Sequence, residues 1–153
     1  MLAVIETPEG FAAFLAERLA QSRKYAEARM RTTCTVDRIR LADDGNPMTT
    51  TSSTGVVTEE REDVYEGKCR VHYSGTPWPN TPDVAGASVT VRPIFVSIPI
   101  DAPQLKVGDR ITVTADLDTP LIVGNVYRAI EPGNASQETA QRVLCQHLED
   151  GAA

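Results

Sequence analysis

The stretch VYEGKCRVHYSG, residues 64–75, decides the fold that this sequence predicts. From Lys68 to Tyr73, apolar side chains alternate with basic ones, which is the period-two pattern of a β-strand with one buried face. Cys69 and His72 stand three positions apart, so on a strand they point to opposite sides of the sheet. A regular strand therefore cannot hold one metal ion between them. We expect Cys69 to face the core and His72 to face away from it.

The chain around this strand divides near residue 30 into a helical part and a β-rich part. Seven of the 17 alanines lie in the first 30 residues, whereas 14 of the 15 valines follow them. Thr7, Pro8 and Glu9 form a helix start, because they suit the cap, the first helical position and the positive end of the helix dipole. We expect an amphipathic helix from about residue 8 to 27, packed on the β-rich part or on a neighbouring subunit. Its apolar face consists of Phe11, Phe14, Leu15, Leu19 and Tyr25.

A series of strand candidates separated by turn residues follows the helix. Their short spacing, with no helix between them, predicts an antiparallel β-barrel or sandwich. We therefore expect a mainly β protein with a helical segment at 1–30 and a β-barrel domain at 31–153, which together form one structural domain. The strand candidates are 32–41, 56–60, 68–73, 87–100, 107–116, 121–130 and 138–149, of which the last also fits a helix, although a strand is preferred.

Two positions predict irregularities in these strands. In 87–100, apolar residues occupy odd positions up to Val91 and even positions from Ile94, so the inward face changes at Pro93. Proline donates no ladder hydrogen bond and is tolerated at bulges, which predicts a bulge or sharp bend there. Gly124 predicts a second bulge. The residues expected to face inward from 107–116 are Ile111, Val113 and Ala115.

The sequence contains no recognisable motif for catalysis or metal binding. G-x-S-x-G, a Walker-type glycine loop and G-x-G-x-x-G after a strand are absent, as are the paired cysteine and histidine units of structural zinc sites. Cys145 and His147 could share one face of a strand, but no further ligands are spaced to join them. Cys34 and His147 could act as nucleophile and base, but nothing in the sequence brings them together. We expect no enzymatic activity, no metal and no cofactor, and reduced cysteines that behave as small apolar residues.

The net charge of −6 comes from one stretch of the chain. Residues 42–66 hold seven acids and one base, and the rest of the chain holds 14 of each sign. No basic patch of the kind that binds nucleic acid is visible, and no apolar run approaches the roughly 20 residues that span a membrane. The N-terminus also lacks the basic flank of a signal peptide. The plainest interpretation of 42–66 is a solvated acidic loop.

Large or polar side chains on expected loops are candidates for contact with partners. Trp78, the only tryptophan, lies between two prolines, where it either meets a partner or folds over the barrel end. The polar loop 42–55 offers further candidates, and we expect its 45–55 part to move on assembly. The candidate interface or channel-facing residues are Met48, Thr49, Thr50, Thr51, Glu59, Glu60, Glu62, Asp63 and Trp78.

The order helix, strand, polar loop, VYEGKCRV, long strand ending VSIPID, VGDRITVTAD and GNVYRAI resembles the head-to-tail connector proteins of tailed phages. It is similar in particular to the head-closure, or stopper, proteins of actinobacterial phages and prophages, over most of the chain from about residue 8. The resemblance implies a small β-barrel with a peripheral helix, a mobile loop and no catalytic residue. It also implies a ring of six or twelve copies in the virion neck, assembled in the bacterial cytoplasm.

In such a ring, the protein would close the DNA exit beneath the portal and adaptor and meet the tail-terminator proteins. An acidic inner face would repel phosphate, so that DNA slides through the channel without specific binding. We expect 42–66 to face the channel or an adjoining ring. The alternatives are a tail-terminator or tail-completion protein, an OB-like binding module, which would need basic residues interleaved with exposed aromatics, and a soluble enzyme.

Overall fold

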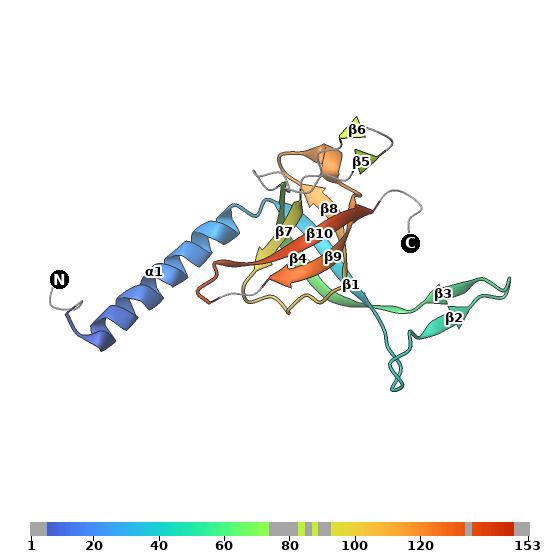
Figure 1. Ribbon diagram of the computed structural model, residues 1–153, viewed down its shortest axis with the longest axis horizontal. Helices are drawn as coiled ribbons and strands as arrows, with labels where there is room; N and C mark the ends of the chain where they lie inside the picture. Colours follow the sequence, from blue (N-terminus) through green and yellow to red (C-terminus); the bar gives the residue numbers. More distant parts are fainter. Residues whose placement is uncertain (1–5, 74–82, 85–86, 89–92, 134–135, 149–153) are drawn as a thin grey trace.

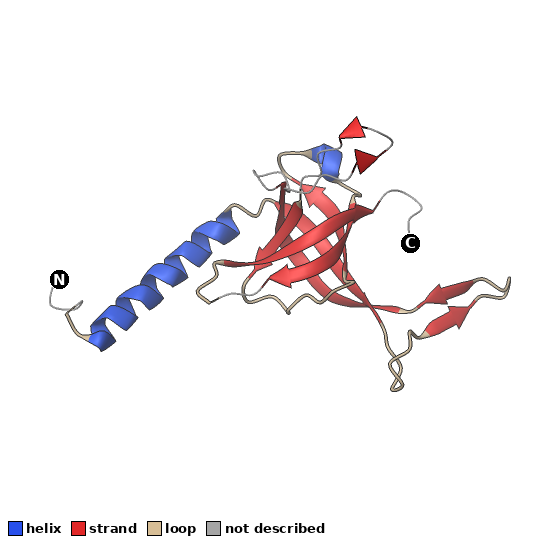
Figure 2. Ribbon diagram, viewed as in Figure 1, coloured by secondary structure: helices blue, strands red, loops and turns tan. Residues whose placement is uncertain are grey.

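A β-barrel forms the centre of the structure, a computed structural model that describes residues 6–73, 83–84, 87–88, 93–133 and 136–148. Its strands are β1 (Thr32–Ile39), β4 (Arg61–Tyr73), β7 (Ile94–Pro99), β8 (Arg110–Asp116), β9 (Val126–Gly133) and β10 (Ala140–Leu148). They close in the order β1-β4-β7-β10-β9-β8, with every pair antiparallel. Figure 2 shows the barrel strands in red at the centre of the molecule. The predicted mainly β fold is confirmed, and closure decides for the barrel over the sandwich.

Several smaller elements lie outside the barrel. They are the helix α1 (Pro8–Ala28), the hairpin of β2 (Thr49–Thr51) and β3 (Val57–Glu59), the hairpin of β5 (Asp83–Val84) and β6 (Ala87–Ser88), and the 3-10 helix η2 (Pro120–Ile122). Figure 1 shows α1 and the β2–β3 hairpin projecting from opposite ends of the barrel, along the long axis of the molecule. The barrel is thus the compact part of an elongated molecule.

The helix begins where the sequence predicts and ends one residue later. The Thr7 hydroxyl accepts a hydrogen bond from the Gly10 N–H at 3.0 Å, and Pro8 opens the first turn. Of the two packing partners expected for its apolar face, the barrel of the same chain does not cover it. No residue of α1 is buried, and Phe11 remains 48% exposed. The helix makes few contacts with its own barrel, at β7, at β10 and at Lys68 of β4.

The barrel core follows the predicted alternation. Cys69 is fully buried, whereas His72 lies outside the core and stacks on Phe95 with 5.8 Å between the ring centroids. The C-terminal candidate is a strand, because Val143 and Cys145 enter the core two positions apart. The core residues are Cys34, Val36, Cys69, Val96, Ile98, Leu105, Ile111, Val113, Tyr127, Ala129, Val143 and Cys145.

The observed strands differ from the predicted ones at Ala115 and near Gly124. Ala115 is exposed rather than inward, because the β1–β8 register shifts between Thr33 and Cys34 and leaves Thr114 as an extra residue. At the predicted bulge, Gly124 has a φ of +91°. The Gly124 N–H and the Asn125 carbonyl both bond to Val113, at 2.8 and 3.0 Å. Gly124 and Asn125 thus both oppose Val113, but they lie in the turn after η2 rather than inside a strand, and the strand predicted over 121–130 begins only at Val126.

The long candidate 87–100 is interrupted, and the structure describes only part of it. β7 begins directly after Pro93, and Val96 and Ile98 face the core from it. The strand ends at Pro99, so Ile100 lies in a turn instead of continuing the inward face. Residues 89–92, on the other side of the bend predicted at Pro93, lie outside the described residues.

The solvated loop expected for 42–66 is partly wrong, whereas the strand candidate at 56–60 within it is confirmed by β3. Residues 49–51 and 57–59 form the β2–β3 hairpin, and β4 starts at Arg61 rather than at Lys68. Most of the acidic residues from 59 to 66 therefore belong to strands. The sequence hid this because acidic residues are disfavoured in strands, whereas here they extend from the barrel into water.

The three cysteines provide a test of the core. All three are buried. The pKa of Cys69 is raised, mainly by a hydrogen bond with the Cys34 thiol and secondly by burial. Burial raises the pKa of Cys145 to about 12. Because the reactive form is the thiolate, the native protein at pH 8 should react negligibly with an aromatic disulfide reagent, whereas all three thiols should react in denaturant. Stoichiometric reaction of any thiol in the native protein within seconds would contradict this core.

Candidate interaction surfaces

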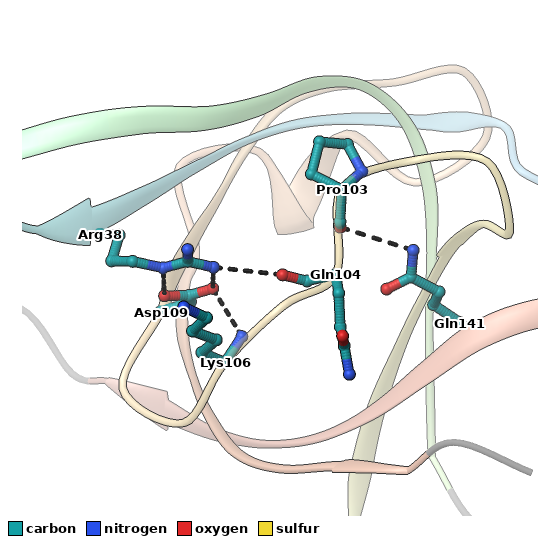
Figure 3. Close-up of polar contacts among 6 residues, drawn as sticks. All are labelled: Arg38, Pro103, Gln104, Lys106, Asp109 and Gln141. Carbon is teal, nitrogen blue, oxygen red and sulfur yellow. Dashed lines mark hydrogen bonds and ion pairs between the residues drawn. The ribbon is translucent and has the colours of Figure 1, made fainter.

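The loop between β7 and β8 covers one end of the barrel and is held there by a buried ion pair (Figure 3). The Arg38 guanidinium donates to both carboxylate oxygens of Asp109, at 2.8 Å each. The Lys106 N–H donates to the same carboxylate at 2.8 Å. Only 1% of the Asp109 side chain is exposed, so these donors replace the water that the carboxylate loses.

Two more contacts fix the same loop. The Gln141 amide donates to the carbonyls of Ala102 and Pro103, at 2.6 and 3.4 Å. Leu105, which is 1% exposed, fills the core between these anchors. This end of the barrel is therefore rigid. No local signal in the sequence pairs Asp109 with Arg38, which lies 71 positions away.

The β2–β3 hairpin leaves the same end of the barrel, close to Gly108 of this loop, through a three-way backbone junction. The Arg40 N–H donates to Glu60, the Glu60 N–H to Met48, and the Met48 N–H to Arg40, each at 2.8 Å. The junction joins the end of β1, the start of β2 and the start of β4. Its three hydrogen bonds orient the hairpin, and the Thr50 hydroxyl adds a bond to the Glu60 carboxylate at 2.7 Å.

An ion network fastens this junction to the barrel. Asp37 on β1 receives hydrogen bonds from Arg61 on β4 and from Arg110 on β8. Arg128 on β9 lies directly opposite Arg110, and Glu59 joins them around a hollow of about 240 Å³. The base of the hairpin therefore lies beside charged side chains from β1, β4, β8 and β9, and these contacts restrict the orientation of the hairpin relative to the barrel.

The candidate interface residues fall into three groups. Thr49, Thr50, Thr51 and Glu59 are exposed on the hairpin, as the sequence analysis expects of residues that meet a partner. Met48 and Glu60 are half-buried in the junction, so their first role is structural. Glu62 and Asp63 are exposed on β4, beside the hairpin rather than on it. Trp78 lies outside the described residues.

Helix α1 presents a second candidate surface. The sequence predicts its apolar helix face but not the residues that lie opposite that face. Leu15 and Leu19 line a hollow of about 500 Å³ between the helix and residues 137–139. The helix is tied to the barrel by Arg23, which donates to the Glu138 carbonyl at 3.1 Å, and by Glu27, which pairs with Lys68 at 3.1 Å. These contacts fix the C-terminal part of the helix and leave its N-terminal part projecting (Figure 1).

The described part of the chain contains no cluster of three or more His, Cys, Asp or Glu side chains that could hold a metal ion. Within the same residues, none of the helical segments has the length and apolarity to cross a bilayer.

A family model, described as a family of unknown function (DUF6093), matches residues 22–146 of the chain. The chain belongs to DUF6093. The match begins within α1 and ends within β10, so the barrel of this DUF6093 protein lies almost entirely inside it. No match was found among curated proteins. Among solved structures, the solution structure of protein SF1141 from Shigella flexneri 2a is similar, with 18% identity over 80% of this chain and 96% of that chain, and a TM-score of 0.47.

Proposed function

We propose that this DUF6093 protein is a non-enzymatic structural component of a phage neck. In this role, copies form a head-closure ring that joins the portal and adaptor to the tail and retains the packaged DNA. The observation that carries the proposal is the pair of elements that project from opposite ends of a rigid barrel (Figure 1). A subunit that must hold neighbours on several sides needs such projections.

Both projections gain stability from a partner. A helix of the length of α1 that buries no residue is marginal in water, because most helical stability in proteins comes from tertiary packing. An isolated two-stranded hairpin is also marginal, and every residue of β2 and β3 is exposed. Docking of α1 or of the hairpin on a neighbouring ring would bury surface that is open in the single chain.

The charge of the hairpin base suits a channel that DNA passes through. Glu59 and Glu62 are exposed there, and carboxylates repel the phosphate backbone. If these residues face the channel, the DNA meets a surface that does not hold it. This supports passage of DNA without specific binding.

Deletion of the gene from the phage genome tests the proposal. We expect heads that package DNA and then lose it, together with free tails, because nothing closes the exit. Purified protein added to DNA-filled heads should restore tail attachment. Closed, DNA-filled heads in the deletion strain would contradict the proposal, and in that case addition of the purified protein to isolated tails tests the tail-terminator alternative.

A further inference from the structure

The fold assembles a basic cluster that the sequence does not reveal. Arg70 on β4 and Arg142 on β10 both pair with Ser97 of β7, one from each side. Since neighbouring strands lie about 4.8 Å apart, the backbones of the two arginines are about 10 Å apart at the same level of the sheet. Arg29 follows the end of α1, the helix that contacts β7 and β10. We call Arg29, Arg70 and Arg142 the arginine cluster.

The charges of the arginine cluster are not neutralised within the described part of the chain. There, Arg38 and Arg61 each pair with an aspartate, whereas no carboxylate lies within 4.0 Å of a cluster member. Burial, and then the charges of Arg29 and Arg142, lower the pKa of Arg70. Like charges therefore face one another on this part of the barrel, which favours an anionic partner.

The other end of β4 carries the opposite charge. Asp63 and Glu66 are exposed and pair with Asp37 and Thr35 of β1, and neither makes an ion pair with the residues that the structure describes. Along the strand, Glu66 is about 13 Å and Asp63 about 23 Å from Arg70. Both distances exceed the Debye length of about 8 Å at physiological salt, so these carboxylates neutralise Arg70 poorly within one chain.

We propose that the arginine cluster of one copy binds the carboxylates of Asp63 and Glu66 of a second copy. Contact between two different patches is head-to-tail, and such contacts close into a ring when the rotation between copies allows it. The contact between two copies is argued from their charges alone, and only its closure into a ring rests on the proposed function. A second copy is favoured over DNA as the partner because the acidic end of the same strand, and the net charge of −6, oppose the approach of phosphate.

A charge-swap experiment on the full chain tests this contact. One variant carries R70E and R142E, the other D63R and E66R, and self-association is measured by sedimentation velocity at low and high salt. We expect each variant alone to associate at least about tenfold more weakly than the natural protein. An equimolar mixture should recover association, because each swapped patch then meets its complement. K106E, which reverses the charge of an exposed side chain outside both patches, should leave association unchanged.

The outcomes separate this contact from other partners. A natural protein that stays monomeric at low salt and millimolar concentration, or a mixture that does not recover, would overturn the proposal. It would equally be overturned if R70E/R142E weakened binding to a DNA duplex while self-association persisted. If a reversed variant does not fold, R70Q/R142Q and D63N/E66Q provide the same comparison with neutral side chains. A protein that passes the gene-deletion test but fails this one is a neck component whose copies meet elsewhere.

Discussion

Replacement of Arg38 by alanine is expected to lower the free energy of unfolding by about 3–5 kcal/mol. The variant leaves the Asp109 carboxylate, which is 1% exposed, with the Lys106 N–H as its remaining donor. A buried carboxylate without a counter-ion is costly to keep charged. Because whole domains are stable by only about 5–15 kcal/mol, urea titration should show a large shift of the midpoint.

Two matched variants show whether the loss of stability comes from the buried ion pair. Asp109→Ala should cost less than Arg38→Ala, because 24% of the Arg38 side chain is exposed and the guanidinium can turn towards water. Arg40→Ala removes a pair that is open to solvent, at 3.5 Å from Glu60, and should cost no more than about 1 kcal/mol. Equal losses for Arg38→Ala and Arg40→Ala would show that the loop between β7 and β8 does not depend on the buried pair.

Removal of the β2–β3 hairpin is expected to abolish incorporation of the protein into the neck. In this variant an Asn-Gly turn replaces residues 42–58, which joins the ends of β1 and β4 directly. The barrel should keep its stability to within about 1 kcal/mol, because no residue of β2 or β3 is buried. Electron microscopy of particles made by a deletion strain that expresses the variant measures incorporation.

Ser53→Ala, at the exposed tip, keeps the hairpin and serves as the control. Normal tailed particles with the shortened variant would show that the hairpin makes no essential contact. Limited proteolysis gives a second measure, since a hairpin that docks on a partner should be cut more slowly in assembled particles than in the free protein. Equal cleavage in both states would contradict docking through the hairpin.

The barrel was predictable because its signals are local and repeat every two residues. Alternation placed Cys69, Val113 and Val143 inward without knowledge of their partners. The same rule misplaced Ala115, since a bulge changes the inward face and depends on the register of the neighbouring strand. The acidic start of β4 was missed because its residues have low strand propensity and are held in the strand by hydrogen bonding to β1.

The interaction surfaces were harder to predict than the fold. The candidates at 59–63 came from counting charges along the chain, which finds clusters that are contiguous in sequence. Arg29, Arg70 and Arg142 are spread over more than 100 positions and meet only because β4 and β10 both pair with β7. Their proximity depends on strand order, and composition carries no information about that order.

Closure of the barrel also restricts how another polypeptide can extend the sheets of this protein by strand addition. Every barrel strand has a neighbour on both sides, but some strands are longer than the pairing. β4 pairs with β7 only from Arg70 to Tyr73, so its first part, from Arg61, has a strand partner only in β1. Among the described residues, a partner that recognises the main chain could therefore align with this part of β4 or with the outer edges of the β2–β3 hairpin, which stands well away from the barrel (Figure 1).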